Sequence, residues 1–195
     1  FGNKVSATIS RNGDLVHRMY LEIECTTESS VGSMAQANFG SAIIQDCEVE
    51  IGGQKIDKQT GLWMETWAEL TEPNPTGHAA LQTTATGTGN SGTLFQNMSM
   101  MGGVGGVNAM TAIPPITVPL QFWFCRNPGL ALPLIALQYH EVKVVLNIST
   151  AAQAHGTSAA NRTTGPSMEL FCDYIYLDTD ERRRFAQVSH EYLIE

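Results

Sequence analysis

The chain has 195 residues, of which 15% are charged, and its formal net charge is −8 at pH 7. This acidic balance argues against a nucleic-acid-binding face, because phosphate binding needs clustered Lys and Arg. No run of about 18 apolar residues occurs, so no transmembrane segment is predicted. The 18 glycines favour many short strands joined by tight turns over a helical bundle.

Two alternating segments open the chain. Residues 4–9 alternate Val5, Ala7 and Ile9 with polar neighbours, which predicts a strand. His17 lies on the apolar face of the next segment, and we interpret it as a core or edge histidine with one hydrogen bond. Between the two segments, Arg11–Asp14 contains Asn-Gly, which taken alone predicts a two-residue hairpin. The apolar face of the second segment consists of Leu15, Met19, Leu21, Ile23 and Cys25.

A third alternating segment covers residues 43–51. Its core face is expected to contain Ile43, Gln45, Cys47, Val49 and Ile51. Asp46, Glu48 and Glu50 lie opposite, but hard cations need oxygens that converge from several segments, so we expect a solvated acidic face and no metal site. The small, polar segment Thr26–Gly40 predicts a loop before this strand. Gly52-Gly53 predicts a turn into a short strand at Gln54–Lys58.

The hydrophobic period becomes helical at Gly61–Leu70. Thr60 is a suitable N-cap, so we predict one short amphipathic helix laid on the sandwich. Its apolar stripe consists of Leu62, Trp63, Thr66, Trp67 and Leu70. The two tryptophans could form a ligand platform, but large rings more often pack against a core, and we expect this stripe to do so.

Residues 71–115 form a long insertion rich in Gly, Thr, Asn, Ser and Ala. The Gly-rich run at 102–106 lacks the lysine and the strand–helix frame of a phosphate-binding loop, so no nucleotide site is predicted. A loop of about 45 residues is unusual in a compact domain and tends to be functional or mobile. We expect one strand within it, near Thr93–Met98.

The stretch Val118–Ile148 has the strongest strand signals. Leu120–Cys125 predicts an aromatic strand, Asn127-Pro128-Gly129 predicts a turn, and His140–Ile148 predicts a half-buried strand. Ser149–Ser167 then predicts a second polar loop. Met168–Leu177 has apolar residues on both faces, as is typical of a strand covered on both sides. Asp178–Arg184 mixes acids with arginines and indicates an exposed linker.

Catalytic motifs are absent from the sequence. The five histidines are scattered, and neither HExxH nor GxSxG occurs, so we predict no enzyme and no catalytic, cofactor-binding or metal site. The four cysteines, Cys25, Cys47, Cys125 and Cys172, lack the spacing of zinc ligands. Three disulfide connectivities stay open, but buried free thiols are favoured. N-glycosylation sequons start at Asn97, Asn147 and Asn161, and Asn161 is the most accessible by its loop position.

Three segments resemble one protein family. FWFCRNPGLALPLIALQYHEVKV (residues 122–144), SRNGDLVHRMYLEI (Ser10–Ile23) and YIYLDTDERRRFAQVSHEYLIE (Tyr174–Glu195) are similar to the major capsid proteins of nucleocytoplasmic large DNA viruses. They cover under half of the chain but span it from end to end. The resemblance implies an all-β fold, an antiparallel eight-stranded jelly-roll sandwich that is the first half of a double jelly roll, with one short helix and long loops.

The resemblance also sets the expected domain organisation. Residues 1–178 would form the first jelly roll, residues 71–115 an outward loop, and residues 179–195 a linker toward a second jelly roll absent from this chain. Phe1 is not a methionine and no signal peptide follows, so we expect a trimmed terminus. In a viral jelly roll the first two strands lie in opposite sheets, so Arg11–Asp14 is expected to be a corner and not a hairpin.

The implied function is structural. Such a protein would assemble as a homotrimeric, pseudo-hexameric capsomer that contacts neighbouring capsomers and minor capsid proteins. The resulting icosahedral shell would overlie an internal membrane and be assembled in the host cytoplasm, with no direct contact to nucleic acid. A jelly-roll carbohydrate-binding module is the alternative, although the loops contain few of the aromatic residues that lectin sites use.

Overall fold

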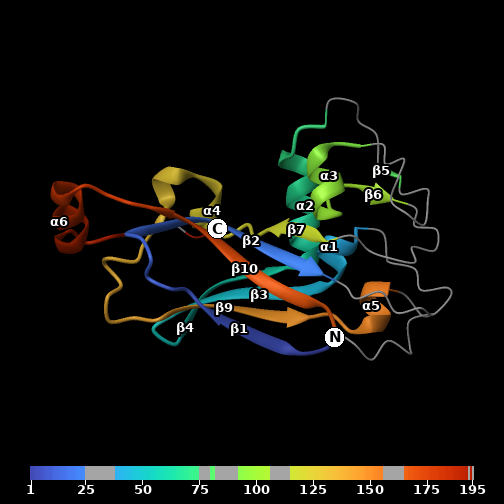
Figure 1. Cartoon of the computed structure of the whole chain (residues 1–195), viewed down its shortest axis with the longest axis horizontal. Coiled ribbons are helices and arrows are strands. Elements are labelled where there is room, and N and C mark those ends of the chain that lie inside the picture. The colour runs from blue at the N-terminus through green and yellow to red at the C-terminus, as the bar shows by residue number, and fades with distance from the viewer. Residues whose placement is uncertain are drawn as a thin grey trace.

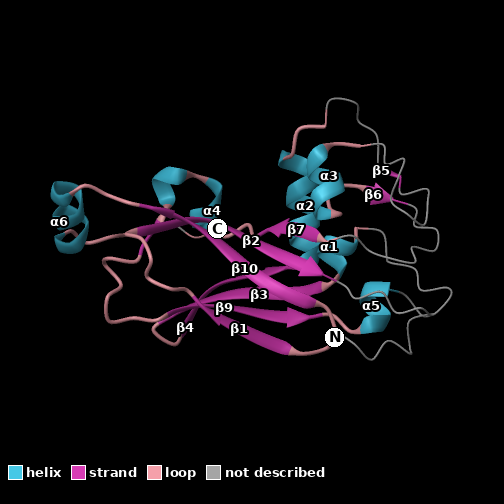
Figure 2. Cartoon of the chain, viewed as in Figure 1, coloured by secondary structure: helices cyan, strands magenta, loops and turns pink. Residues whose placement is uncertain are grey.

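Two antiparallel sheets pack face to face in the computed structural model, which describes residues 1–24, 38–74, 80–81, 92–105, 115–155, 165–192 and 194 (Figures 1 and 2). The first sheet has the order β1 (Lys4–Thr8), β9 (Val142–Ile148), β3 (Ile44–Ile51) and β4 (Gln54–Thr60). The second has the order β10 (Ser167–Ile175), β2 (Leu15–Glu24) and β7 (Ile116–Pro119), and β8 (Leu132–Pro133) also pairs with β2. The expected antiparallel sandwich of about eight strands is therefore confirmed.

The connection between β1 and β2 is a corner, because the two strands belong to different sheets. The expectation of a corner is confirmed, and the hairpin suggested by Asn-Gly alone is wrong. Contacts with the end of β10 fix the corner: the Tyr174 hydroxyl donates to the Ser10 carbonyl at 2.7 Å, and the Leu177 N–H donates to Asp14 at 2.8 Å. Gly13 is needed here because a Cβ at this position would lie 2.6 Å from the Cβ of Tyr174.

The core lies between the inner faces of the two sheets. β2 and β9 contribute the residues that the alternation predicted, which are Leu15, Met19, Leu21, Ile23, Val142, Val144, Leu146 and Ile148. His17 is also buried, and its Nδ1 lies 2.7 Å from the Phe124 carbonyl oxygen. The interpretation of His17 as a core histidine with one hydrogen bond is confirmed. Cys25 lies outside the described residues.

The aromatic segment is not a strand, contrary to the expectation for Leu120–Cys125. β7 ends at Pro119, and α4 (Trp123–Arg126) is a single helical turn followed by the 3₁₀ turn η1 (Pro128–Leu130). Three consecutive rings, those of Phe122, Trp123 and Phe124, are buried. Adjacent residues on a strand point to opposite faces, so a half-buried strand could not bury all three. The helical turn does, and it places the Trp123 and Phe124 ring centroids 4.9 Å apart, edge to face.

The chain has more helices than the single one expected. α2 (Gly61–Thr71) is confirmed, and the Thr60 side chain accepts from the Trp63 N–H as predicted. The expected strand near Thr93–Met98 is wrong, because α3 (Leu94–Ser99) occupies it and begins with a capping box between Thr93 and Gln96. Besides α4, three further helices in the described part of the chain lie in segments expected to be irregular. α1 (Phe39–Ala42) begins within the expected loop Thr26–Gly40, and α5 (Ala151–His155) lies within the expected loop Ser149–Ser167. α6 (Thr179–Gln187) lies within the expected linker.

All the described helices except α4 lie at the two ends of the sandwich (Figure 1). α1, α2, α3 and α5 lie at one end, where a short parallel pair, β5 (Ala80–Leu81) and β6 (Val104–Gly105), also lies, and α6 lies at the other end (Figure 1). Among the residues that the structure describes, no helix is both long and apolar enough to cross a bilayer. The remainders of the expected loops, residues 26–37 and 156–164, lie outside the described part of the chain.

β10 differs from the prediction of a strand covered on both sides. It lies at the edge of its sheet, next to β2 only, and the Phe171 ring is 48% exposed. The inward residues Met168, Leu170, Cys172 and Tyr174 pack against the core while remaining partly exposed. Among the residues that the structure describes, then, only one face of β10 is covered.

Replacing Trp123 with Ala should lower the free energy of unfolding by ~3–5 kcal/mol, because a 5% exposed ring is lost from the core and leaves a cavity. Urea denaturation followed by circular dichroism measures the change. The matched control is Trp63→Ala, since Trp63 is 41% exposed and should cost less than ~1 kcal/mol. Equal costs for the two variants would contradict the core position of Trp123.

Candidate functional site

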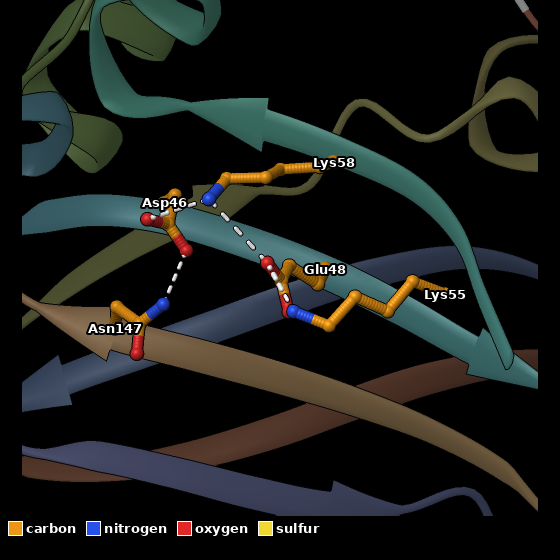
Figure 3. Close-up of polar contacts among 5 residues, drawn as sticks. All are labelled: Asp46, Glu48, Lys55, Lys58 and Asn147. Atoms are coloured by element: carbon orange, nitrogen blue, oxygen red, sulfur yellow. Dashed lines mark hydrogen bonds and ion pairs between the residues drawn. The ribbon is translucent and has the colours of Figure 1, made fainter. Parts of the chain in front are cut away.

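A cluster of charged side chains covers the outer face of the first sheet (Figure 3). Asp46 and Glu48 on β3 face Lys55 and Lys58 on β4, and Asn147 on β9 lies on the other side of Asp46. The Lys55 ammonium lies 2.8 Å from Glu48, and the Lys58 ammonium lies 3.3 Å from Asp46 and 3.4 Å from Glu48. The Asn147 amide donates to Asp46.

The expected solvated acidic face on β3 is wrong. Asp46 is 7% exposed and Glu48 only 2%, because the long lysine side chains of the next strand lie over them. The hydrogen bond from Lys55 lowers the pKa of Glu48, although burial opposes this effect. The hydrogen bond to Asp46 raises the pKa of Lys58. Two acids are thus balanced by two lysines, and among the described residues no group of three or more His, Cys, Asp or Glu side chains could hold a metal ion.

A second buried carboxylate, Glu65 on α2, connects the long insertion to the sandwich. Its Oε1 accepts the backbone N–H groups of Gly102 and Gly103, both at 2.9 Å, and its Oε2 accepts the Ser41 hydroxyl at 3.0 Å. Glu65 is 8% exposed, and burial raises its pKa even though these hydrogen bonds favour the ionised form. This role was not predicted, because Glu65 lies opposite the apolar stripe, on the side expected to face solvent.

Further polar contacts hold residues 94–105 at the same place. The Val104 N–H donates to the Asn38 side chain at 2.6 Å, and the Gln96 amide donates to the Gly102 carbonyl at 2.6 Å. Gly40 in α1 packs directly on the backbone of Ser99, where a larger residue could not fit. The returning part of the insertion is therefore fixed to α1 and α2.

The apolar stripe of α2 faces away from the core, contrary to expectation. The buried residues of the helix are instead Gly61, Met64, Glu65 and Ala68. Leu62 is 78% exposed and Leu70 is 76% exposed. Trp67 is half-buried beneath the Arg126 guanidinium, 4.2 Å from the ring centroid, so this ring packs as expected. Trp63 is 41% exposed, and its ring centroid lies 5.8 Å from that of Trp67.

The three cysteines that the structure describes, Cys47, Cys125 and Cys172, are free thiols, as favoured from the sequence. Burial raises the pKa of Cys47 and of Cys125 to about 12, and that of Cys172 to about 11. These thiols stay protonated at neutral pH and are poor nucleophiles.

Two of the three sequons lie in regular structure. Asn97 is half-buried on α3, and Asn147 lies on β9 with its amide bonded to Asp46. An asparagine whose amide is engaged in a sheet is a poor acceptor for a glycan. Asn161 lies outside the described residues, so its accessibility stays a prediction.

The carboxyl-terminal segment returns to the sandwich after α6. Asp178 caps this helix, and Arg182 forms a 2.9 Å ion pair with Asp14 at the β1–β2 corner. Beyond the helix, the Tyr192 hydroxyl donates to the Ala131 carbonyl at 3.3 Å, and its ring centroid lies 6.5 Å from that of Trp123. α6 itself has no buried residue.

Comparisons with known proteins give one consistent result. The family model described as the major capsid protein N-terminus matches residues 1–178. The major capsid protein of Pyramimonas orientalis virus is 50% identical over 197 aligned residues, which cover 100% of this chain and 45% of the relative. The major capsid protein of Paramecium bursaria Chlorella virus 1 is 40% identical, and the alignment covers 100% of this chain and 41% of the relative. The chain therefore spans less than half the length of these curated relatives.

Solved structures give the same result for the fold. The crystal structure of VP54 from PBCV-1, fitted into a reconstruction of the virophage Sputnik, superposes with a TM-score of 0.72 at 38% identity, covering 100% of this chain and 43% of VP54. A structure of Sulfolobus turreted icosahedral virus superposes with a TM-score of 0.52 at 10% identity. The alignment covers 92% of this chain and 43% of the viral chain, and at this identity it shows a similar fold only.

Replacing Glu65 with Gln should change how stability depends on pH. Burial raises the pKa of Glu65 in the folded chain, so the folded state holds the proton more tightly, and the wild type loses stability as the pH rises through this pKa. Gln keeps an acceptor for the two glycine N–H groups but does not titrate in this range. The free energy of unfolding of the wild type, relative to Glu65→Gln, should therefore be greater at about pH 5 than at about pH 8.

Urea denaturation across this pH range measures the difference. Glu169→Gln, on the exposed face of β10, is the control for the chemical change itself. A wild-type stability that rises relative to Glu65→Gln as the pH rises would contradict the effect of burial on Glu65.

Proposed function

The chain belongs to the family of major capsid proteins of large DNA viruses, and on this premise we propose that it forms the amino-terminal jelly roll of a capsid shell protein with two such domains. The observation that carries the proposal is the agreement of fold and sequence over the whole chain with a capsid protein structure, at 38% identity and a TM-score of 0.72. The role of this family is structural. No comparison supports the carbohydrate-binding alternative.

Assembly into trimers is the next part of the proposal. Three copies of a polypeptide with two jelly rolls would give six similar lobes and hence a pseudo-hexameric capsomer. Contacts between unlike surfaces form a closed ring only if the rotations that relate successive lobes add up to a full turn. A ring of six lobes from three subunits therefore needs both lobes of each subunit. Such capsomers would then contact one another and the minor capsid proteins in an icosahedral shell over an internal membrane.

The proposed place of assembly is the host cytoplasm. Support comes from Cys47, Cys125 and Cys172, which are free thiols. Free thiols are the normal state in a reducing compartment, whereas secreted proteins of this size often contain disulfides.

The proposed domain boundary lies near residue 178. β10, the last strand of the sandwich, ends at Ile175, and the exposed helix α6 follows at Thr179–Gln187. A helix with no buried residue of its own suits a connecting segment. We propose that residues 179–195 lead toward a second jelly roll, with Tyr192, near the end of this segment, packed against Trp123.

The insertion at residues 71–115 is proposed to form part of the outer surface of the capsomer. Support comes from its composition, rich in Gly, Thr, Asn, Ser and Ala, and from the position of α2 and α3 at one end of the sandwich (Figure 1). The anchors at Glu65 and Asn38 would hold the base of this outward loop.

The oligomeric state tests the proposed function. A protein that ends at Glu195 should be a monomer or an ill-defined aggregate by light scattering, because it supplies one lobe only. The polypeptide at the full length of its relatives should be a discrete trimer. A stable, discrete trimer from the short protein would mean that this half alone carries the interface, and the two-lobe scheme would be wrong.

Limited proteolysis of intact particles tests the position of the insertion. Cleavage should occur first within residues 71–115, because an outward loop is accessible while the sandwich and its connecting segment are covered by neighbours. Mass spectrometry of the fragments locates the cuts. Full protection of residues 71–115 together with cleavage within residues 178–195 would contradict the assignment.

A further inference from the structure

Helix α2 has apolar residues on two sides, and the described residues bury only one of these sides. Met64 and Ala68 are buried in the core. The opposite side is the stripe Leu62, Trp63, Thr66, Trp67 and Leu70, at the spacing of a single helical face. Surface helices normally show one apolar face, and a helix that is apolar on several sides is normally covered on each of them. Leu62 and Leu70, both more than three-quarters exposed, therefore indicate a contact surface.

The stripe continues into a groove on the outer side of the second sheet. Trp67 belongs to both, and it lines a groove of about 470 Å³ together with Arg18, Tyr20, Phe95 and Arg126. Arg126 is held in place there, since its guanidinium lies over the Trp67 ring and its Nε donates to the Gln121 carbonyl at 3.1 Å. Trp, Tyr and Arg are the residues most enriched at the energetic centres of protein interfaces.

The charge of the groove is opposite to that of the chain. Its lining includes two arginines, Arg18 and Arg126, and one acid, Glu72. The whole chain carries a net charge of −8. Complementary potentials steer and orient association, so this basic groove suits a partner surface with excess carboxylates. The neighbouring subunit of the proposed capsomer contains this same acidic domain and therefore offers carboxylates to the groove.

We propose that the α2 stripe and the groove beside it, defined by Leu62, Trp63, Trp67, Leu70, Arg18 and Arg126, form the surface on which a neighbouring subunit of the same capsomer docks. Apolar side chains of the neighbour would cover the stripe, and a carboxylate would enter the groove between the two arginines. The inference rests on the proposed trimer. It adds which part of this domain contacts the neighbour and with what chemistry.

The test uses the full-length polypeptide with Leu62→Glu and Leu70→Glu combined. Both side chains are exposed, so the subunit should fold normally, whereas two carboxylates on the docking surface should raise the dissociation constant of the trimer roughly tenfold or more. The control is Tyr139→Glu. Tyr139 is 94% exposed and lies just before β9. The start of β9 pairs with Ile51, at the end of β3, whereas α2 follows Thr60, which pairs with Asp46 near the beginning of β3. The control is therefore at the opposite end of the sheet from α2. Sedimentation equilibrium measures the dissociation constants.

A second measurement needs no substitution. Hydroxyl-radical footprinting of the wild type should show that oxidation of Trp63 falls on trimer formation, while oxidation of Tyr139 changes less. The proposal is wrong if the double variant trimerises as tightly as the control, or if Trp63 is oxidised equally in trimer and in free subunit. A wild type that forms no trimer would instead refute the proposed capsomer, and the docking surface with it. If the Leu62→Glu, Leu70→Glu variant forms normal trimers but is not incorporated into particles, the surface binds another partner and the proposal is also wrong.

Discussion

The second sheet depends on β2, which has neighbours along both of its edges. β10 pairs with one edge, and β7 and β8 pair with the other. The inner face of β2 supplies Met19, Leu21 and Ile23 to the core, and His17 on the same strand contacts the Phe124 carbonyl of α4. Segments from three distant parts of the sequence are thereby held by one strand of ten residues. The order of this sheet follows from these pairings, and so does the position of the aromatic turn.

Two buried glutamates show how the same side chain takes different roles. Glu48 is covered by lysine side chains on the outside of a sheet, so its charge is compensated and its pKa is lowered. Glu65 meets backbone N–H groups and a hydroxyl between helices, where burial dominates and the pKa is raised. The first secures the pairing of β3 with β4, and the second fastens the returning insertion to α2. Both are structural, in agreement with the family to which the chain belongs.

The sequence predicted strands where apolar and polar residues alternate along the chain, although the burial of β1 and β3 does not follow that alternation: Val5 is 43% exposed and Gln45 is exposed. β1, β2, β3 and β9, the turn at Gly52-Gly53 and the Thr60 cap all follow from local patterns. The prediction of a strand at Phe122–Phe124 was wrong because three adjacent rings are buried there. The prediction for α2 was wrong because the helix has two apolar sides, and the side that packs against the core contains Met64 and Ala68. The burial of Glu48 also needed knowledge of which strand lies beside β3. The capping box of Thr93 and Gln96 could have predicted the start of α3, but the Gly- and Thr-rich composition of the insertion suggested a loop with one strand instead.

The exposed edge of β10 has a consequence for the tendency of this domain to aggregate. An edge strand with an exposed aromatic ring can template pairing with another chain, and such pairing leads to aggregation. Phe171 is flanked on the same outward side by Glu169 and Asp173, and the strand is irregular between Cys172 and Tyr174. Charges and irregularities of this kind hinder the register that a foreign strand would need. β10 thus contains charged residues and an irregularity that hinder such pairing at its exposed edge.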